Sequence, residues 1–161
     1  MEIREATEAD LPRLARLFAE MESHYGSPAG GQVEMVETRL KAWFADNTDT
    51  TLLVAEENGE LNGVTSLVPL FPAGQLREAL FVKDVFVSER ARGQGLGEAL
   101  LRAAAAIAKK RGSYRLELTV DRTNTGAARL YQRLGAQDTS KMYLRWDEKM
   151  LTDLAEGQDH A

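Results

Sequence analysis

The chain has no cysteine, and His24 and His160 are its only histidines. The first absence excludes disulfide bonds, thiolate catalysis and zinc held by cysteine. The second argues against a histidine-rich metal site, so we expect no metal. A covalent intermediate carried on a thiol is excluded as well.

Surplus positive charge and long apolar runs are also lacking. The net charge is -5, whereas a general nucleic-acid binder shows a basic surplus. No window reaches the ~18 uninterrupted apolar residues of a membrane span. The first residues, "MEIREATEADLPRL", contain no apolar core of the signal-peptide type. We therefore expect no nucleic-acid partner, no membrane association and a cytoplasmic location.

The length and composition are those of one globular domain. At 161 residues, 43% of them apolar, the chain can bury a full core, and it shows no linker, repeat or low-complexity segment. We predict a single domain over residues 1–161, in which 147–161 form an acidic tail with at most a short helix.

Local patterns predict a mixed α/β fold in the order β-α-α-β-β-β-α-β-α-β. Thr7 and Asp10 form a capping-box-like start to a helix that runs to about His24. The pair Asn58-Gly59 between two β-rich runs is a strong hairpin signal. The other predicted elements are strands over 2–7, 79–87, 114–120 and 141–146, and helices over 33–44, from Gly95 to about Lys110, and over 124–134.

The stretch "SERARGQGLGEALL" places alternating glycines between a strand and a helix. Glycine allows positive φ and a close approach of the backbone to a ligand. A helix N-terminus exposes unpaired N–H groups that accept phosphate. The pattern indicates a pyrophosphate site to which Arg92 adds charge; the alternative is a tight turn that needs glycine for its geometry alone.

Two common nucleotide sites do not fit this stretch. A P-loop would continue as Gly-Lys-Ser/Thr, and Gly97-Glu98-Ala99 does not. A dinucleotide fingerprint would read G-x-G-x-x-G within a βαβ unit, and its acidic residue would have to be Glu117, which falls inside a predicted strand. Both interpretations fail on context.

The run Arg92-Gly93-Gln94-Gly95-Leu96-Gly97 resembles the Q/R-x-x-G-x-G/A motif of the GNAT superfamily of acyl-CoA N-acyltransferases. The preceding "VFV" and the later "NTGAARLYQRLGA" resemble neighbouring segments of that family, and the likeness covers about residues 2–146. It implies a central, mostly antiparallel sheet flanked by helices. It also implies acetyl-CoA as co-substrate.

The resemblance assigns the donor site residue by residue. Backbone amides of the glycine loop would hold the pyrophosphate, the edge of the strand before it would pair with the pantetheine arm, and a helix cap would touch that arm. These cofactor-binding residues are Val85, Phe86, Val87, Arg92, Gly93, Gln94, Gly95, Leu96, Gly97, Glu98 and Asn124.

Tyr131 matches the family's general acid. Amine attack on a thioester is helped by a proton for the departing thiolate, and a tyrosine of pKa about 10 suits a thiol of about 8.5. By spacing alone Tyr131 belongs to an ordinary core stripe with Ala127, Leu130 and Leu134. Asp84, in the strand beside the pantetheine segment, would bind or deprotonate the amine, or else is an edge carboxylate without chemistry.

The acceptor is less defined than the donor. The motifs are similar to those of diamine/polyamine acetyltransferases, whose first helix ends in an acidic and aromatic cluster, as "EMESHY" does here. We expect Glu22, Tyr25 and Asp84 to bind a small-molecule primary amine. Lys83 departs from the usual pair of acidic residues and would repel a polycation. The alternatives are a non-catalytic acyl-CoA sensor and acetylation of a protein or peptide amine; the family also implies a possible homodimer.

Overall fold

A computed structural model describes residues 1–46 and 49–157. The end of the predicted acidic tail, with His160, lies outside the described residues. The chain divides into two compact units, Met1–Leu118 and Thr119–Ala161, which we describe one after the other.

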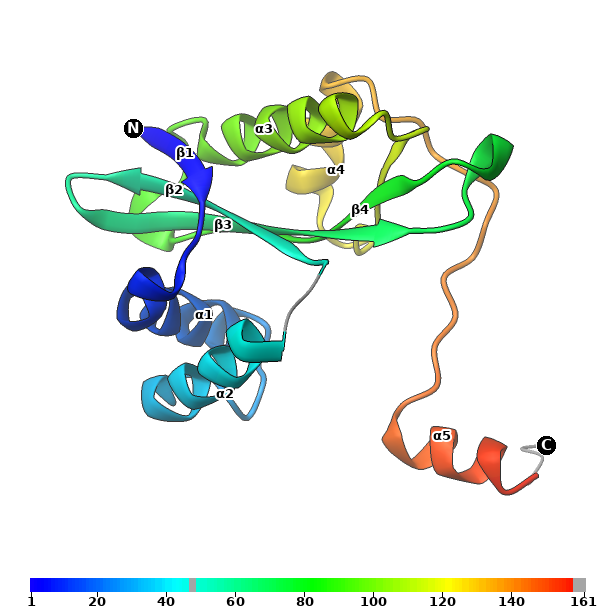
Figure 1. Cartoon of the computed structure of the whole chain (residues 1–161). Helices are drawn as coiled ribbons and strands as arrows, with labels where there is room; N and C mark the ends of the chain where they lie inside the picture. The colour runs from blue at the N-terminus through cyan, green and yellow to red at the C-terminus, as the bar shows by residue number, and fades with distance from the viewer. Residues whose placement is uncertain (47–48, 158–161) are drawn as a thin grey trace. The chain divides into compact units, whose positions relative to one another are not determined.

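The first unit contains a five-stranded sheet in the order β1-β2-β3-β4-β5 (Figure 1). The first four strands pair antiparallel and β5 lies parallel to β4, so the predicted mixed, mostly antiparallel sheet is confirmed. At the predicted hairpin both Asn58 and Gly59 have positive φ, 54° and 79°, as a two-residue I′ turn requires. The strands are β1 (Glu2–Glu5), β2 (Thr51–Glu57), β3 (Glu60–Leu70), β4 (Ala79–Val87) and β5 (Leu116–Leu118).

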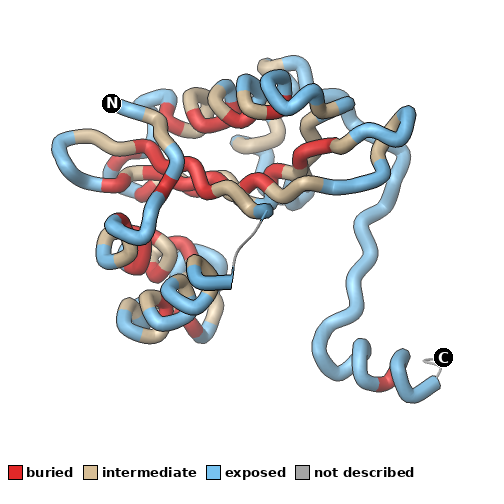
Figure 2. Tube along the Cα trace, viewed as in Figure 1, coloured by how far each residue is buried: buried red, intermediate tan, exposed pale blue. Residues whose placement is uncertain are grey.

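Helices cover both faces of this sheet. Helices α1 (Leu11–His24) and α2 (Val33–Asp46) lie on one face, and α3 (Leu96–Arg111) lies on the other (Figure 1). Buried residues follow β2, β3 and the inner sides of the helices (Figure 2). The core between the sheet and α1 consists of Ala6, Leu14, Leu17, Met21, Leu52, Val54, Leu61, Val64 and Phe86.

On the opposite face α3 approaches the sheet closely at Gly63. A Cβ added there would lie 3.1 Å from Leu100 Cδ1 and 3.1 Å from the Phe86 carbonyl oxygen. Glycine at this position therefore lets α3 pack directly on β3 and β4.

An ion-pair network holds the start of α1 against the sheet. Both Arg4 terminal nitrogens donate to the carboxylate of Asp10 at 2.8 Å, and Arg13 Nη1 donates to Glu56 Oε1 at 2.9 Å. Arg4 also pairs with Glu56, and Arg13 with Asp10. The Asp10 carboxylate also accepts the Thr7 N–H at 2.9 Å, which confirms the predicted capping box. Hydrogen bonds from Arg4 hold the pKa of Asp10 far below its usual range, against the opposing effect of burial.

The second unit contains α4 (Thr125–Arg133) and α5 (Glu148–Ala155). Asn124 caps α4 by accepting the Ala127 N–H at 3.1 Å, and Gly135 follows its end with φ 93°. The cap at Asn124 confirms what the family resemblance implies for this helix start.

The predicted strand over 141–146 is wrong, and the strand predicted over 114–120 is shorter, as β5. Residues 141–146 form no strand, and their apolar side chains are exposed. A strand needs a neighbour for its backbone groups, and among the described residues this segment pairs with none. The exposed apolar residues of this segment are Met142, Tyr143, Leu144 and Trp146.

Candidate functional site

The glycine loop, residues 93–97, leads into the start of α3, which has no side-chain cap. Gly93 and Gly95 have φ of 78° and 80°, and a Cβ on either would meet nothing within 4 Å, so the backbone conformation is what requires glycine. The first intrahelical bond runs from the Ala99 N–H to the Gly95 carbonyl at 3.0 Å. The N–H groups of residues 96–98 therefore have no acceptor within α3 and are suited to an anion.

Two features of the first turn go beyond a simple tight turn. Gly97 lies inside α3, where no left-handed residue is needed. The Glu98 carboxylate accepts hydrogen bonds from Arg102 at 2.8 and 3.0 Å, which balances the negative charge nearest the helix start. Both features favour an anion site over a turn alone.

The edge of β4 next to this loop is open. β5 pairs with β4 only from Leu80 to Val82, while β4 continues to Val87. The Ser88 N–H donates to the Asn62 carbonyl at 2.9 Å, and in an antiparallel ladder this makes Val85 and Val87 turn their N–H and C=O groups away from β3. Along 83–87, no described strand pairs with that side, which suits an extended, amide-bearing ligand.

A β-bulge sets the position of Asp84 where β5 ends. Ser66 lies opposite Asp84 and Leu67 opposite Val82, so Lys83 is an extra residue in β4. The buried Thr65 hydroxyl donates to the Asp84 carbonyl at 2.7 Å. Lys83 Nζ lies 3.7 Å from Asp84 Oδ1 and partly balances its charge.

The end of α1 lies beside the end of β4. Burial raises the pKa of Tyr25, the negative charge of Asp84 raises it further, and the positive charge of Arg92 opposes both. The structure therefore brings the predicted substrate-binding residues Tyr25 and Asp84 within electrostatic reach of each other. The His24 ring lies 6.0 Å from that of Phe86, and Arg92 Nη2 lies 3.5 Å from His24 Nδ1. Arg92 Nε also donates to the Val87 carbonyl at 3.2 Å, a contact that the sequence did not predict.

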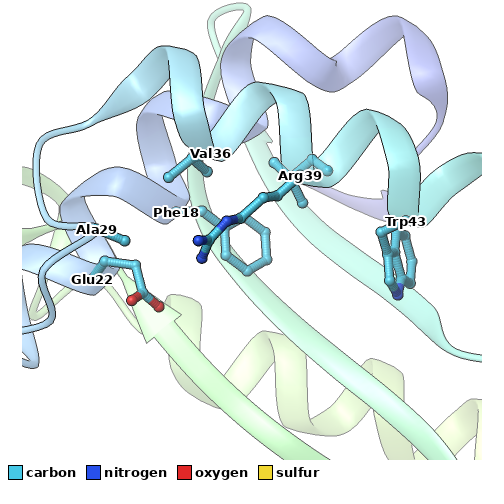
Figure 3. A pocket seen from close by; sticks show the side chains of 7 residues that line it. Phe18, Glu22, Ala29, Val36, Arg39 and Trp43 are labelled. Atoms are coloured by element: carbon cyan, nitrogen blue, oxygen red, sulfur yellow. The ribbon is translucent and has the colours of Figure 1, made fainter.

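Glu22, the remaining predicted acceptor residue, lines a pocket between α1 and α2 (Figure 3). Sequence reasoning missed the contribution of α2 to it. The spacing of Val36, Leu40 and Trp43 shows that α2 has an apolar face, but nothing local indicates that Arg39 faces Glu22. The pocket has a volume of about 270 Å³ and is lined by Phe18, Glu22, Ala29, Val36, Arg39, Leu40 and Trp43.

In the second unit Tyr131 lies on α4, about two turns after the cap at Asn124. Tyr131 is half-buried, as are Ala127, Leu130 and Leu134, and no residue of α4 is fully buried.

The part of the chain that the structure describes holds neither a metal-binding cluster nor a membrane-spanning helix. Within residues 1–46 and 49–157 no group of three or more His, Asp or Glu side chains could hold a metal ion. Nor does any helix in these ranges combine the length and apolarity needed to cross a bilayer.

Comparison with known proteins decides the family. The profile of the Acetyltransferase (GNAT) family matches residues 13–136, a range that contains the glycine loop, Asn124 and Tyr131. This chain belongs to the GNAT family. It is an acyltransferase, as the resemblance predicted, and members of its family use acetyl-CoA as co-substrate.

Two relatives of this GNAT enzyme match it over more than nine-tenths of their own length. It is 33% identical over 138 residues to the uncharacterized N-acetyltransferase YhfO of Bacillus subtilis, covering 86% of this chain and 91% of that protein. It is 29% identical over 165 residues to the thialysine N-epsilon-acetyltransferase of Mus musculus, covering 95% and 96%. Among solved structures, an integron cassette protein from the mobile metagenome of V. cholerae superposes with a TM-score of 0.84 at 28% identity, covering 96% of this chain and 97% of that one.

The residues of this GNAT enzyme fit acetyl-CoA. The uncapped start of α3, with left-handed Gly93 and Gly95, suits a diphosphate, and the open edge at Val85 suits the amides of an extended arm.

Proposed function

We propose that this enzyme transfers the acetyl group of acetyl-CoA to a primary amine of a small molecule, by direct attack in a ternary complex. The observation that carries the proposal is the open edge of β4, which runs from the Asp84 carboxylate to the glycine loop at the start of α3. One strand edge thus joins an amine-binding group to an anion-binding group. The absence of cysteine supports direct transfer, because no thiol can carry the acetyl group.

The donor is held mainly by backbone groups. N–H groups of residues 93–98 bind the diphosphate, the main chain of Val85 and Val87 pairs with the pantetheine arm, and Asn124 contacts that arm. Arg92 adds positive charge near the end of β4. When bound, acetyl-CoA supplies a thioester carbonyl that is activated toward amines.

The chemistry then needs two proton movements. The amine nitrogen forms a bond to the carbonyl carbon as the carbon–sulfur bond breaks. Asp84 accepts the proton that the amine loses, directly or through water, and Tyr131 donates a proton to the departing sulfur. A backbone N–H near Val85 stabilises the charge on the carbonyl oxygen. Glu22 and Tyr25 position the acceptor.

Three further parts of the proposal concern the whole protein. A single catalytic domain is supported by the family match over 13–136, which includes residues of both units. A homodimer is supported by the exposed apolar side chains of residues 142–154. A cytoplasmic location accords with acetyl-CoA as an intracellular co-substrate.

The test is thiol release from acetyl-CoA in the presence of a panel of primary amines, followed with a thiol-reactive dye. Because the chain has no cysteine, the protein contributes no background. We expect one class of amine to accelerate release. No acceleration with diamines, amino acids, aminoglycosides or peptides would contradict transfer and favour an acyl-CoA sensor.

The variant Tyr131→Phe tests the proton donor in the same assay. We expect turnover to fall about tenfold or more, since a positioned acid typically contributes at least that much, with acetyl-CoA affinity unchanged. Tyr114→Phe, an exposed tyrosine outside the proposed site, is the matched control. Unchanged turnover in Tyr131→Phe would remove Tyr131 from the mechanism.

A further inference from the structure

The pocket between α1 and α2 presents two opposite charges. Glu22 comes from α1 and Arg39 from α2, and in Figure 3 the guanidinium and the carboxylate point into the same space beside the Phe18 ring. Within the described residues the structure shows no ion pair or hydrogen bond for either side chain. A carboxylate and a guanidinium are therefore both available to a ligand.

The rest of the pocket is apolar and anchored in the core. Phe18, Leu40 and Trp43 pack against the cluster beneath the sheet, and Val36 is buried. These side chains form a fixed wall behind the two charged groups. A ligand that matches this lining carries a cationic group, an anionic group and a short aliphatic chain.

The end of α1 links the pocket to the proposed reaction site. Glu22 and Tyr25 are three residues apart and share a face at the end of α1. Tyr25 in turn lies within electrostatic reach of Asp84, and His24 lies against Phe86 of β4. Glu22, which lines the pocket, and Tyr25 thus connect the pocket to the end of β4.

We propose that this pocket binds the α-ammonium and α-carboxylate groups of a diamino acid, with Glu22 contacting the ammonium and Arg39 the carboxylate. The distal amine is then the group that is acetylated. This inference rests on the proposed function and names its substrate class. The bidentate geometry of a guanidinium suits a carboxylate.

A simple diamine or polyamine fits the same groups less well. It has no carboxylate for Arg39, so the guanidinium would stay without a partner in the pocket. A lysine in the interior of a peptide chain has neither a free α-ammonium nor a free α-carboxylate. The charge pattern therefore selects a free amino acid.

The experiment compares substrates that differ only in the carboxylate. Lysine is measured against cadaverine, and ornithine against putrescine, with lysine methyl ester as a third, ester-blocked acceptor. For the wild-type enzyme we expect kcat/KM to be about tenfold or more higher for the free amino acids, the size expected for a charge-assisted hydrogen bond. Comparing 2,4-diaminobutyrate, ornithine and lysine shows which chain length places the distal amine correctly.

The variant Arg39→Gln should remove this preference. We expect KM for the best diamino acid to rise about tenfold or more with kcat nearly unchanged, while kcat/KM for the matched diamine stays the same or rises. Arg39→Lys should restore part of the preference. Arg16→Gln, an exposed arginine of α1 outside the pocket, is the control and should change neither substrate.

Several outcomes would overturn the inference. A wild-type enzyme that prefers the diamine or the ester, or an Arg39→Gln variant that loses both substrates equally, contradicts carboxylate recognition by Arg39. Acetylation of some other amine but of no diamino acid overturns this inference and leaves acetyl transfer standing. If no amine accelerates thiol release from acetyl-CoA, the proposed function itself is overturned. The wild-type substrate comparison decides the question even where a variant folds poorly.

Discussion

At the scale of single residues, Asp10 illustrates how one charge joins three elements. Its side chain is 2% exposed and contacts Arg4 of β1 and Arg13 of α1, which in turn contact Glu56 of β2. Removing one partner leaves the others partly buried and uncompensated. Because α1 leads to Glu22 and Tyr25 at its far end, the network also orients the residues proposed to bind the acceptor.

We predict that Asp10→Asn lowers the free energy of unfolding by about 3 kcal/mol at pH 7. This is the low end of the cost of breaking a buried ion pair, because Arg4 and Arg13 still pair with Glu56 and remain partly exposed to solvent. The folded pKa of Asp10 is lowered, so its stabilisation is complete above the unfolded pKa of about 4 and is lost as the pH falls below it. Urea unfolding at pH 7 and at pH 3 measures both effects.

The difference between Asp10→Asn and wild type should accordingly shrink at pH 3. Asp138→Asn, an exposed aspartate, is the control and should be nearly silent at both pH values. A difference that is the same at pH 7 and pH 3 would show that the carboxylate charge does not stabilise the fold.

At the scale of elements, α3 is bounded by two comparable glycines. Gly95 begins the helix with φ 80° and Gly112 ends it with φ 71°, and a Cβ on either would meet nothing within 4 Å. Only the first lies at the N–H groups proposed to hold the diphosphate. The two ends therefore separate the cost of a strained backbone from an effect on binding.

We predict that Gly95→Ala and Gly112→Ala each lower the unfolding free energy by about 1 kcal/mol, because L-residues disfavour the left-handed conformation. Gly95→Ala should also weaken coenzyme A binding about tenfold or more, and Gly112→Ala should not. Calorimetric titration with coenzyme A measures this. Equal affinity in the two variants would place the diphosphate elsewhere.

At the scale of the whole molecule, the exposed apolar side chains of residues 142–154 indicate a surface that binds another protein chain. They comprise Met142, Tyr143, Leu144 and Trp146 of the extended segment, and Met150, Leu151 and Leu154 of α5. Side chains of this size gathered within one short stretch mark an interaction site. The segment also has backbone groups that pair with no described strand, which a second copy could satisfy.

We predict that the protein elutes with a mass twice the 17.8 kDa of one chain in size-exclusion chromatography with light scattering. Met142→Glu, at a position 78% exposed, should shift this mass toward the monomer. Leu76→Glu, at a loop position 77% exposed, should leave it unchanged. A monomeric wild type would contradict the homodimer.

Local signals in the sequence determined much of this protein. The Asn58-Gly59 hairpin, the Asn124 cap and the glycines before α3 could be predicted because each depends on the backbone preferences of one or two residues. The family motif of the glycine loop belongs to the same class of signal. It predicted the GNAT family and, with it, acetyl-CoA as the co-substrate that members of this family use.

Only the tertiary structure decided the features that depend on distant partners. The bulge at Lys83 arises from the register of β4 on β3, the open edge from where β5 ends, and the missing strand at 141–146 from the lack of a neighbour to pair with. Arg39 came to face Glu22 because α2 packs beside α1. Such contacts join residues far apart in the chain, and no local pattern of spacing or propensity encodes them.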